Sequence, residues 1–295
     1  MTGMPESGVR YMATVGMFDG VHLGHAFALR SLAALACERG LKPLVLTFDA
    51  HPLATIAPGR APSPLTDFSQ KKDLISRLSA DMAVQCLDFG HAMQTLSGAG
   101  FLELIHNKFG VDAFAMGYNN HIGHDRATPA CLSDACIPVV TLAPFGHDIS
   151  SSHVRRCIAE GNVAEAARLL GRPYSCRGTV VHGRQLGRTI GFPTANIKPL
   201  NPGQLLPAGG VYAVDVRFPS GIVSRGMANI GRRPTVESGH AEISFEVNIF
   251  DYSGDLYGSV LEIEFLGRLR DEKAFASLDE LRRQLGRDML AAKIF

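Results

Sequence analysis

The stretch that decides the fold is MATVGMFDGVHLGHAFALRSLAALACERG, residues 12–40. Its first five residues form a short apolar run that predicts a buried strand, and residues 26–40 have the apolar spacing of a helix. Gly16 and Gly20 in the connection allow a tight turn and a close approach of the backbone to a ligand. The free N–H groups at the start of a helix favour a bound phosphate. The stretch therefore predicts a strand, a phosphate-binding turn and a helix.

Two histidines stand at the predicted start of this helix. His22 and His25 are three residues apart, a spacing that places both imidazoles on one side of the first turn. There they can donate hydrogen bonds to phosphate oxygens as negative charge builds up during a displacement. The same His-x-Gly-His spelling recurs as HIGH at residues 121–124. No long helix is predicted after the second copy, so we interpret it as a loop with a coincidental spelling.

Strand and helix patterns alternate through the first half of the chain. Further strands are predicted at 43–48, 82–89, 111–117 and 137–144, with helices at 71–80, 98–110 and 153–174. Strict alternation predicts a parallel sheet covered by helices on both faces. Ligands of such sheets bind at the carboxyl ends of the strands.

The pattern changes at Ser175. Short strands separated by Gly and Pro are typical of a small antiparallel barrel, and they are predicted at 178–183, 210–218, 224–231, 242–250 and 259–267. A last helix is predicted to begin at Ser277 as N-cap, with Glu280 as its capping-box partner. The chain is thus predicted to have two domains, residues 1–172 and 173–295.

Composition limits the class of protein. The chain has 295 residues, is 46% hydrophobic and carries 29 basic against 28 acidic residues. This balance argues against nucleic acid as a partner, because a phosphate-backbone binder usually has a basic excess. The six cysteines form no C-x-x-C pair, which favours reduced thiols. The sequence has no signal-peptide or membrane-spanning pattern, so we expect a cytoplasmic protein that does not bind membranes.

Motifs along the chain resemble those of the bacterial bifunctional riboflavin kinase/FAD synthetases. GMFDGVHLGH, TFDAHP, GYNNHIGHDR and ISSSHVR resemble the FMN adenylyltransferase module. GTVVHGRQLGRTIGFPTAN and EVNIFDYSGDLYG resemble the riboflavin kinase module, and the resemblance covers nearly the whole chain. It implies a nucleotidyltransferase-type α/β domain with a Rossmann-like parallel sheet, followed by a small antiparallel β-barrel kinase domain with a C-terminal helix.

The first module of this family transfers AMP from ATP to FMN, giving FAD and pyrophosphate. The resemblance implies that His22 and His25 stabilise the α-phosphate in the transition state. The residues that it implies in nucleotide or phosphate binding are Gly16, Phe18, Asp19, Gly20, Asn119, Ser151, Ser152 and Arg155. It places His51 near the substrate. Ser152 could equally cap a helix.

The second module phosphorylates riboflavin on its ribityl 5′-hydroxyl. The resemblance implies that Thr194 and Asn196 bind Mg²⁺ with ATP and that Glu246 is the general base. From its strand pattern alone, Glu246 would be an ordinary outward-facing residue. Arg270 is expected near the flavin or in an exposed salt bridge. The glycines expected to form a flexible loop over the nucleotide are Gly178, Gly183, Gly187 and Gly191.

Two departures from the family keep alternatives open. His121 and Ile122 stand where relatives commonly have Arg-Phe, so a riboflavin kinase with a weak or inactive adenylyltransferase domain is the nearest alternative. We expect His121→Ala to change FAD synthesis little compared with His22→Ala. Asn248 stands where relatives often have His, and it keeps hydrogen-bonding capacity.

Rival classes fit less well. A regulatory flavin sensor should have lost Thr194, Asn196 and Glu246, and an aminoacyl-tRNA synthetase should have a KMSKS-like segment. We expect a monomer or a weak homo-oligomer.

Overall fold

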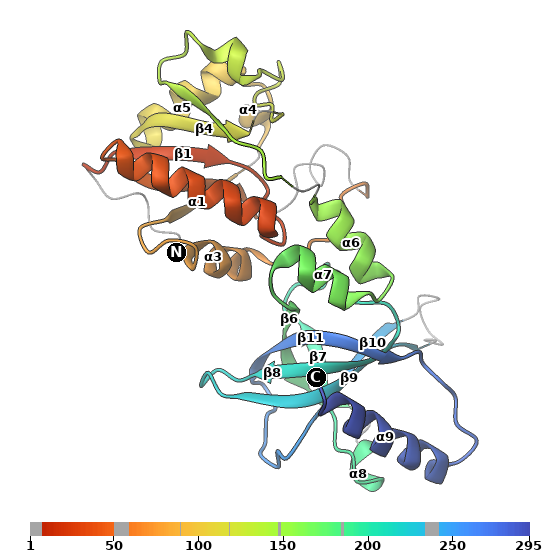
Figure 1. The fold of residues 1–295 in the computed structure, drawn as a ribbon. Coiled ribbons are helices and arrows are strands. Elements are labelled where there is room, and N and C mark those ends of the chain that lie inside the picture. The colour runs from red at the N-terminus through yellow and green to blue at the C-terminus, as the bar shows by residue number, and fades with distance from the viewer. Residues whose placement is uncertain are drawn as a thin grey trace. The chain divides into compact units, whose positions relative to one another are not determined.

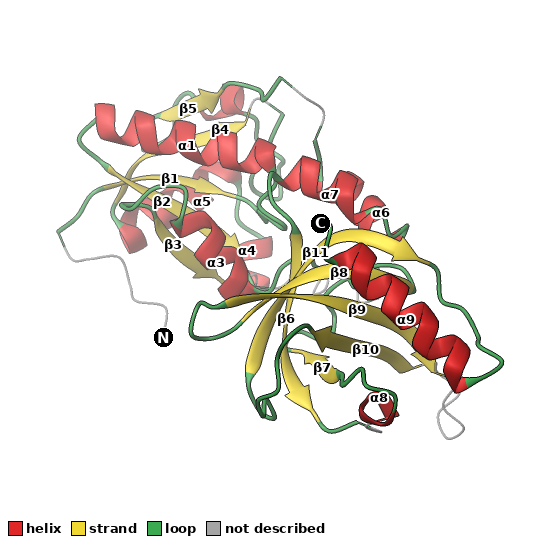
Figure 2. Cartoon of the chain, turned by 60° about the horizontal axis from the view of Figure 1, so that its bottom comes forward, coloured by secondary structure: helices red, strands yellow, loops and turns green. Residues whose placement is uncertain are grey.

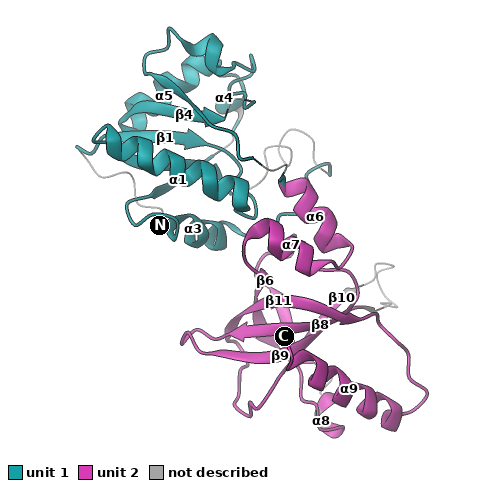
Figure 3. Ribbon diagram, viewed as in Figure 1, with its two compact units in different colours: residues 1–150 teal, residues 151–295 magenta. Residues whose placement is uncertain are grey.

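The structure is a computed structural model that describes residues 8–49, 59–88, 90–117, 119–146, 149–183, 186–233 and 242–295. It divides into two compact units, residues 1–150 and 151–295 (Figure 3). The units divide at 150/151, on the N-terminal side of the boundary predicted at 172/173. The difference arises because the helices α6 (Ser151–Ala159) and α7 (Val163–Leu170) belong to the second unit. There α7 packs against β6 (Tyr174–Val181) and β11 (Val260–Arg270).

The first unit, coloured red to yellow-green in Figure 1, is built on a five-stranded parallel sheet in the order β3-β2-β1-β4-β5, whose strands are labelled in Figure 2. The strands are β1 (Tyr11–Val15), β2 (Lys42–Phe48), β3 (Ala83–Leu87), β4 (Val111–Gly117) and β5 (Val139–Leu142). The central strand β1 pairs in parallel with β2 on one side and β4 on the other. The predicted parallel sheet is confirmed.

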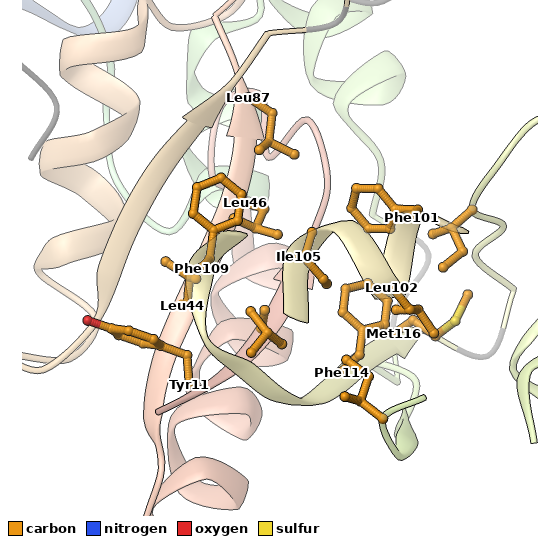
Figure 4. Packing of buried hydrophobic residues seen from close by; sticks show 14 of the residues in the cluster. Tyr11, Leu44, Leu46, Leu87, Phe101, Leu102, Ile105, Phe109, Phe114 and Met116 are labelled. Atoms are coloured by element: carbon orange, nitrogen blue, oxygen red, sulfur yellow. The ribbon is translucent and has the colours of Figure 1, made fainter. Parts of the chain in front are cut away.

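Helices cover both faces of this sheet. On one face, α1 (Leu23–Glu38) and α3 (Phe68–Ser76) bury Leu29, Leu32 and Ile75 in one apolar cluster. On the other, α5 (Gly98–Phe109) packs Leu102 and Ile105 among residues of the sheet (Figure 4). Two short helices, α4 (His91–Gln94) and η1 (Pro129–Leu132), lie in the connections. Burial on both faces explains why the strands read as continuous apolar runs.

The second unit is a closed barrel with the strand order β10-β7-β6-β11-β8-β9 (Figure 2). Its other strands are β7 (Ala195–Pro199), β8 (Gly210–Arg217), β9 (Val223–Arg233) and β10 (Glu242–Ile249). A short helix, α8 (Leu186–Thr189), precedes β7, and α9 (Leu278–Ala292) packs against β8, β9 and β11. The predicted antiparallel barrel with a C-terminal helix is confirmed, but β7 was not predicted.

Two local details differ from the sequence predictions. The helical stretch predicted at 153–174 is two helices, interrupted at Gly161, whose φ of 79° ends α6. Ser277 caps α9 as predicted, because its hydroxyl accepts a hydrogen bond from Glu280 N at 3.2 Å. The Glu280 carboxylate reaches back to Ala276 N at 3.2 Å, so the capping box closes one residue earlier than predicted.

Candidate active sites

The turn between β1 and α1 has an unusual backbone. Phe18, Gly20 and Val21 have φ values of 46°, 76° and 41°. Positive φ is costly for a residue with a side chain, and more so for a β-branched one. Such strain persists only where the surrounding structure holds it, and it concentrates at functional sites. The turn therefore needs anchors.

One anchor is Asp19, which is 4% exposed. Its carboxylate accepts hydrogen bonds from Leu65 N at 3.0 Å and Thr66 N at 3.1 Å. The Thr66 hydroxyl in turn accepts from Gly20 N at 3.3 Å. The carboxylate oxygens of Asp19 thus hold the segment that leads into α3, and its implied role in nucleotide binding stays a prediction. Thr66 was missed because no local pattern marks it.

His22 and His25 lie together at the start of α1, as their spacing predicted. The rings stack with centroids 3.6 Å apart and an interplanar angle of 18°. His22 is the N-cap, and its Nδ1 accepts a hydrogen bond from His25 N at 3.2 Å. Since Nδ1 is an acceptor, a neutral His22 carries its proton on Nε2, and that nitrogen is then the donor of the ring.

His25 is a neutral imidazole at neutral pH. Burial, with smaller contributions from His22 and Lys71, holds the pKa of His25 well below its usual value. Its Nδ1 atom is buried and has no hydrogen-bond partner in the described part of the chain. A buried nitrogen without a partner is costly unless a ligand satisfies it. The histidine pair is thus suited to donate hydrogen bonds to a bound phosphate group.

A cavity of about 380 Å³ opens at the carboxyl end of β1. Its lining includes Val15, Gly16, Phe48, Met93, Gln94, Leu96, Phe101 and residues 121–124. The second His-x-Gly-His copy is a loop, as predicted, since no long helix starts there. It lines the cavity beside Gly16, whereas neither His22 nor His25 is among the described residues that line this cavity. His121 is exposed, and its Nδ1 lies 3.1 Å from Arg126 O.

The remaining predicted residues of the first reaction lie in different segments of the chain. Asn119 is exposed in the turn just before the loop, and His51 lies outside the described residues. Ser151 and Ser152 open α6, and Arg155 follows Ser151 by one helical turn on the same side. These three residues belong to the second compact unit.

The barrel brings Thr194, Asn196 and Glu246 together. The Thr194 hydroxyl donates to a Glu246 carboxylate oxygen at 3.3 Å. Asn196 on β7 lies directly opposite Glu246 on β10, and opposite residues of an antiparallel pair share one face. Hydroxyl, amide and carboxylate oxygens are the donors that a hard cation such as Mg²⁺ prefers. The residues present therefore fit a magnesium ion.

Thr194 lines two cavities of the barrel. The larger, about 310 Å³, is also lined by Phe192, Met227, Asn229, Glu246, Asn248, Arg270, Leu281 and Leu285. The smaller, about 80 Å³, is also lined by Val180, Tyr252, Gly254, Asp255 and Tyr257. The Thr194–Glu246 hydrogen bond therefore lies where two ligand spaces meet.

Two further predictions concern the larger cavity. Asn248 is 6% exposed, and its Nδ2 donates to Pro193 O at 2.6 Å, which ties β10 to the residue before Thr194. Arg270 forms an ion pair with Asp288 of α9 at 2.8 Å, with side-chain exposures of 20% and 5%. Arg270 lines the cavity, but its ion pair with Asp288 is largely buried, so the expected exposed salt bridge is wrong, and a place near the flavin stays a prediction.

The predicted glycine loop is wrong in one position. Gly178 lies inside β6, paired with Pro199 and Leu261, and a Cβ there would come within 2.8 Å of Lys198 O. It is a close-packing residue of the barrel. A Cβ at Gly183 would lie 2.0 Å from the Asn196 amide nitrogen, so this glycine leaves room for Asn196.

These two sites define the class of protein: a nucleotidyltransferase-type α/β unit and a kinase-type barrel in one chain. An FAD synthetase family model matches residues 5–141, and a riboflavin kinase family model matches residues 170–295. The chain belongs to the bifunctional riboflavin kinase/FMN adenylyltransferase family. The alternative of a kinase with a silent first domain is not supported.

Relatives match over nearly their full length. The bifunctional riboflavin kinase/FMN adenylyltransferase of Escherichia coli K12 is 37% identical, covering 99% of this chain and 94% of that protein. The Bacillus subtilis 168 enzyme of the same name is 34% identical, covering 96% and 92%. A crystal structure described as a macrolide-efflux protein from Streptococcus pneumoniae is 31% identical, with a TM-score of 0.89 and coverage of 99% and 96%. In the described residues of this chain, no helix has the length and apolarity to cross a membrane.

Proposed function

We propose that the Thr194–Glu246 site phosphorylates riboflavin and that the histidine turn adenylylates the FMN produced. The observation that carries the first assignment is the hydrogen bond between Thr194 and Glu246 at the meeting point of two cavities. The larger cavity has an apolar side suited to a flavin ring, formed by Phe192, Met227 and Leu285. The smaller one, about 80 Å³, would hold only part of the nucleotide.

In this mechanism Glu246 accepts the proton of the ribityl 5′-hydroxyl. The oxygen then attacks the γ-phosphorus of ATP, and ADP leaves. Thr194 and Asn196 would hold Mg²⁺, which when bound supplies positive charge to the phosphate oxygens. The buried bond from Asn248 to Pro193 keeps the segment that carries Thr194 in register with Glu246.

For the second reaction, a phosphate oxygen of FMN attacks the α-phosphorus of ATP and pyrophosphate leaves. No proton transfer is needed, so the contribution of His22 and His25 is to stabilise the charge that develops on the α-phosphate. Gly16, Gly20 and Phe18 shape the turn. Ser151, Ser152, Arg155 and Asn119 are proposed to bind the phosphates, as the family resemblance implies.

The other parts of the proposal rest on sequence alone. They are a functional boundary at 172/173, close to the start of the riboflavin kinase match at residue 170, a cytoplasmic location, and a monomer or weak homo-oligomer without a nucleic-acid partner. His51 and Arg270 are proposed to lie near substrate.

The test separates the two reactions. The purified Glu246→Gln variant is incubated with ATP and Mg²⁺ and with either riboflavin or FMN, and flavins are separated by chromatography with fluorescence detection. We expect FMN formation from riboflavin to be lost because the base is missing, while conversion of FMN to FAD continues. Loss of both conversions would contradict two separate sites. Removing Mg²⁺ with a chelator should stop FMN formation by the unmodified protein.

A further inference from the structure

Lys71 on α3 is a buried lysine that the sequence analysis did not single out. It is 2% exposed. Its Nζ donates to Phe48 O at 2.6 Å, Met17 O at 3.0 Å and the Thr47 hydroxyl at 3.2 Å. An ammonium group has three N–H bonds and no acceptor, so these three partners use its donors completely.

The three partners lie at or just beyond the carboxyl ends of two neighbouring strands, β2 and β1. Phe48 and Thr47 end β2, and Met17 stands in the turn that follows β1. The Thr47 hydroxyl also donates to Met17 O at 3.1 Å, so one cation and one hydroxyl join the two strand ends. One residue further along the turn, Phe18 has its positive φ. Lys71 thus holds the base of the strained turn that leads to His22.

A second set of bonds holds the other side of the turn. Asp19 and Gly20 bond to Leu65 and Thr66, which directly precede α3. Both anchors therefore come from one segment, residues 65–71, and together they fix the turn on either side of Phe18. The strain at Phe18 and Val21 requires such fixing, because a free chain would relax it.

A buried lysine at this position costs more free energy than an apolar residue of similar size would. Burying an ammonium costs several kcal/mol before its hydrogen bonds compensate, and a methionine would fill similar space without that cost. Burial lowers the pKa of Lys71 from its usual value, and the Asp19 carboxylate partly offsets this effect. The Lys71 charge also contributes to lowering the pKa of His25. A costly polar group beside a strained turn is typical of functional sites.

We propose that Lys71 is a positioning residue for adenylyl transfer, which holds the carboxyl ends of β1 and β2 so that the turn presents His22 and His25 to the phosphate. The inference rests on the proposed role of the histidine turn. Lys71 touches neither substrate nor the reacting atoms, and it acts through the backbone of Met17 and Phe48.

The test compares Lys71→Met with Lys72→Met, its neighbour on α3, in the full-length protein. We expect Lys71→Met to lower kcat for FMN adenylylation by about 10²-fold, the usual cost of misplacing catalytic groups, while KM for FMN changes little. Lys72→Met should stay within about twofold of the unmodified protein. Riboflavin kinase activity in the same sample should be unchanged, because that site lies in the barrel.

A double-mutant cycle separates positioning from simple destabilisation. If Lys71 acts through the histidines, adding Lys71→Met to His25→Gln should cost much less than Lys71→Met alone. A purely structural role would give additive losses. Should Lys71→Met fail to fold, Thr47→Val removes one acceptor and the bond to Met17 with little change in shape. It should lower kcat in the same direction by a smaller factor.

The outcomes are distinguishable. A folded Lys71→Met protein that keeps kcat within about twofold overturns the inference and leaves the proposed adenylyl-transfer site intact. Additive losses with His25→Gln also overturn it. An unmodified protein that makes FMN but no FAD would instead overturn the proposed function of the first unit.

Discussion

At the residue scale, the protonation state of His25 can be measured directly. Burial holds the pKa of His25 well below its usual value. We expect its imidazole carbon-bound proton signals in NMR to stay at their neutral positions as the pH falls from about 8 to about 6. A transition centred near the usual pKa of about 6.5 would contradict the neutral state of His25.

The same residue makes stability depend on pH. Because the folded pKa of His25 is depressed, the unfolded state binds more protons in acid, so His25 lowers the stability of the fold as the pH drops below about 6.5, the unfolded value. Above that pH its contribution is constant. The free energy of unfolding of the unmodified protein should therefore fall more steeply with acid than that of His25→Gln.

Single residues also show where sequence analysis stops. The spacing of His22 and His25 predicted their common side because three residues on a helix start is a local constraint. The bonds from Lys71 to Phe48 and Met17 span 23 and 54 positions, so no local pattern could reveal them. Asp19 was recognised within a motif, but its partners, 46 and 47 positions away, were not.

At the element scale, we expect glycine-to-alanine substitutions in β6 and in α9 to change the stability of the barrel in opposite directions. A Cβ at Gly178 in β6 would come within 2.4 Å of the Ile197 side chain and 2.8 Å of Lys198 O, and backbone cannot move aside cheaply. We expect Gly178→Ala to lower the free energy of unfolding of the barrel by about 1 to 3 kcal/mol, the usual cost of overpacking. Denaturant unfolding followed by circular dichroism would measure it.

Gly286 in α9 is the matched control, since a Cβ there meets nothing within 4 Å. Gly286→Ala should raise the stability of the barrel by up to about 1 kcal/mol, because alanine favours helix more than glycine does. Equal effects of the two substitutions would contradict the assignment of Gly178 to close packing. The strand pattern predicted a strand at 178–183, and only the family resemblance placed Gly178 in the loop over the nucleotide.

Helices and strands were predicted correctly where a clear apolar run or helical spacing marked them. β1, α1 and the strands of the parallel sheet follow apolar runs or helical spacing, and the structure has them within a few residues. β7 was missed because it has only five residues, ANIKP, and ends in Pro199. The break at Gly161 was missed because a glycine inside a helical pattern is compatible with continuation.

At the scale of the whole molecule, the two reactions should be separable between chains. His22→Ala should still make FMN, and Glu246→Gln should still convert FMN to FAD. Mixing the two variants with riboflavin, ATP and Mg²⁺ should therefore restore FAD formation, because free FMN can pass between molecules. If each variant keeps its remaining activity but the mixture makes no FAD, FMN is not exchanged through solution.

The domain order and both fold types were predictable from sequence because the two halves differ in texture: alternating strands and helices, then short strands with turns. The compact units divide at 150/151, and this was not predictable, because the contacts of α7 with β6 and β11 are tertiary. The sequence pattern of a helix between two domains does not show which of the two hydrophobic cores the helix packs against.

The two units also differ in whether their sheets have edge strands. The described strands of the barrel close on themselves, whereas β3 and β5 lie at the margins of the parallel sheet. A marginal strand has backbone groups without a neighbouring strand, and another chain can add to them. β3 has five residues and β5 four, and both are marginal strands of this kind. When this protein is heated, intermolecular aggregation should therefore begin in the α/β unit. The barrel should be carried into the aggregates only because it is joined to that unit.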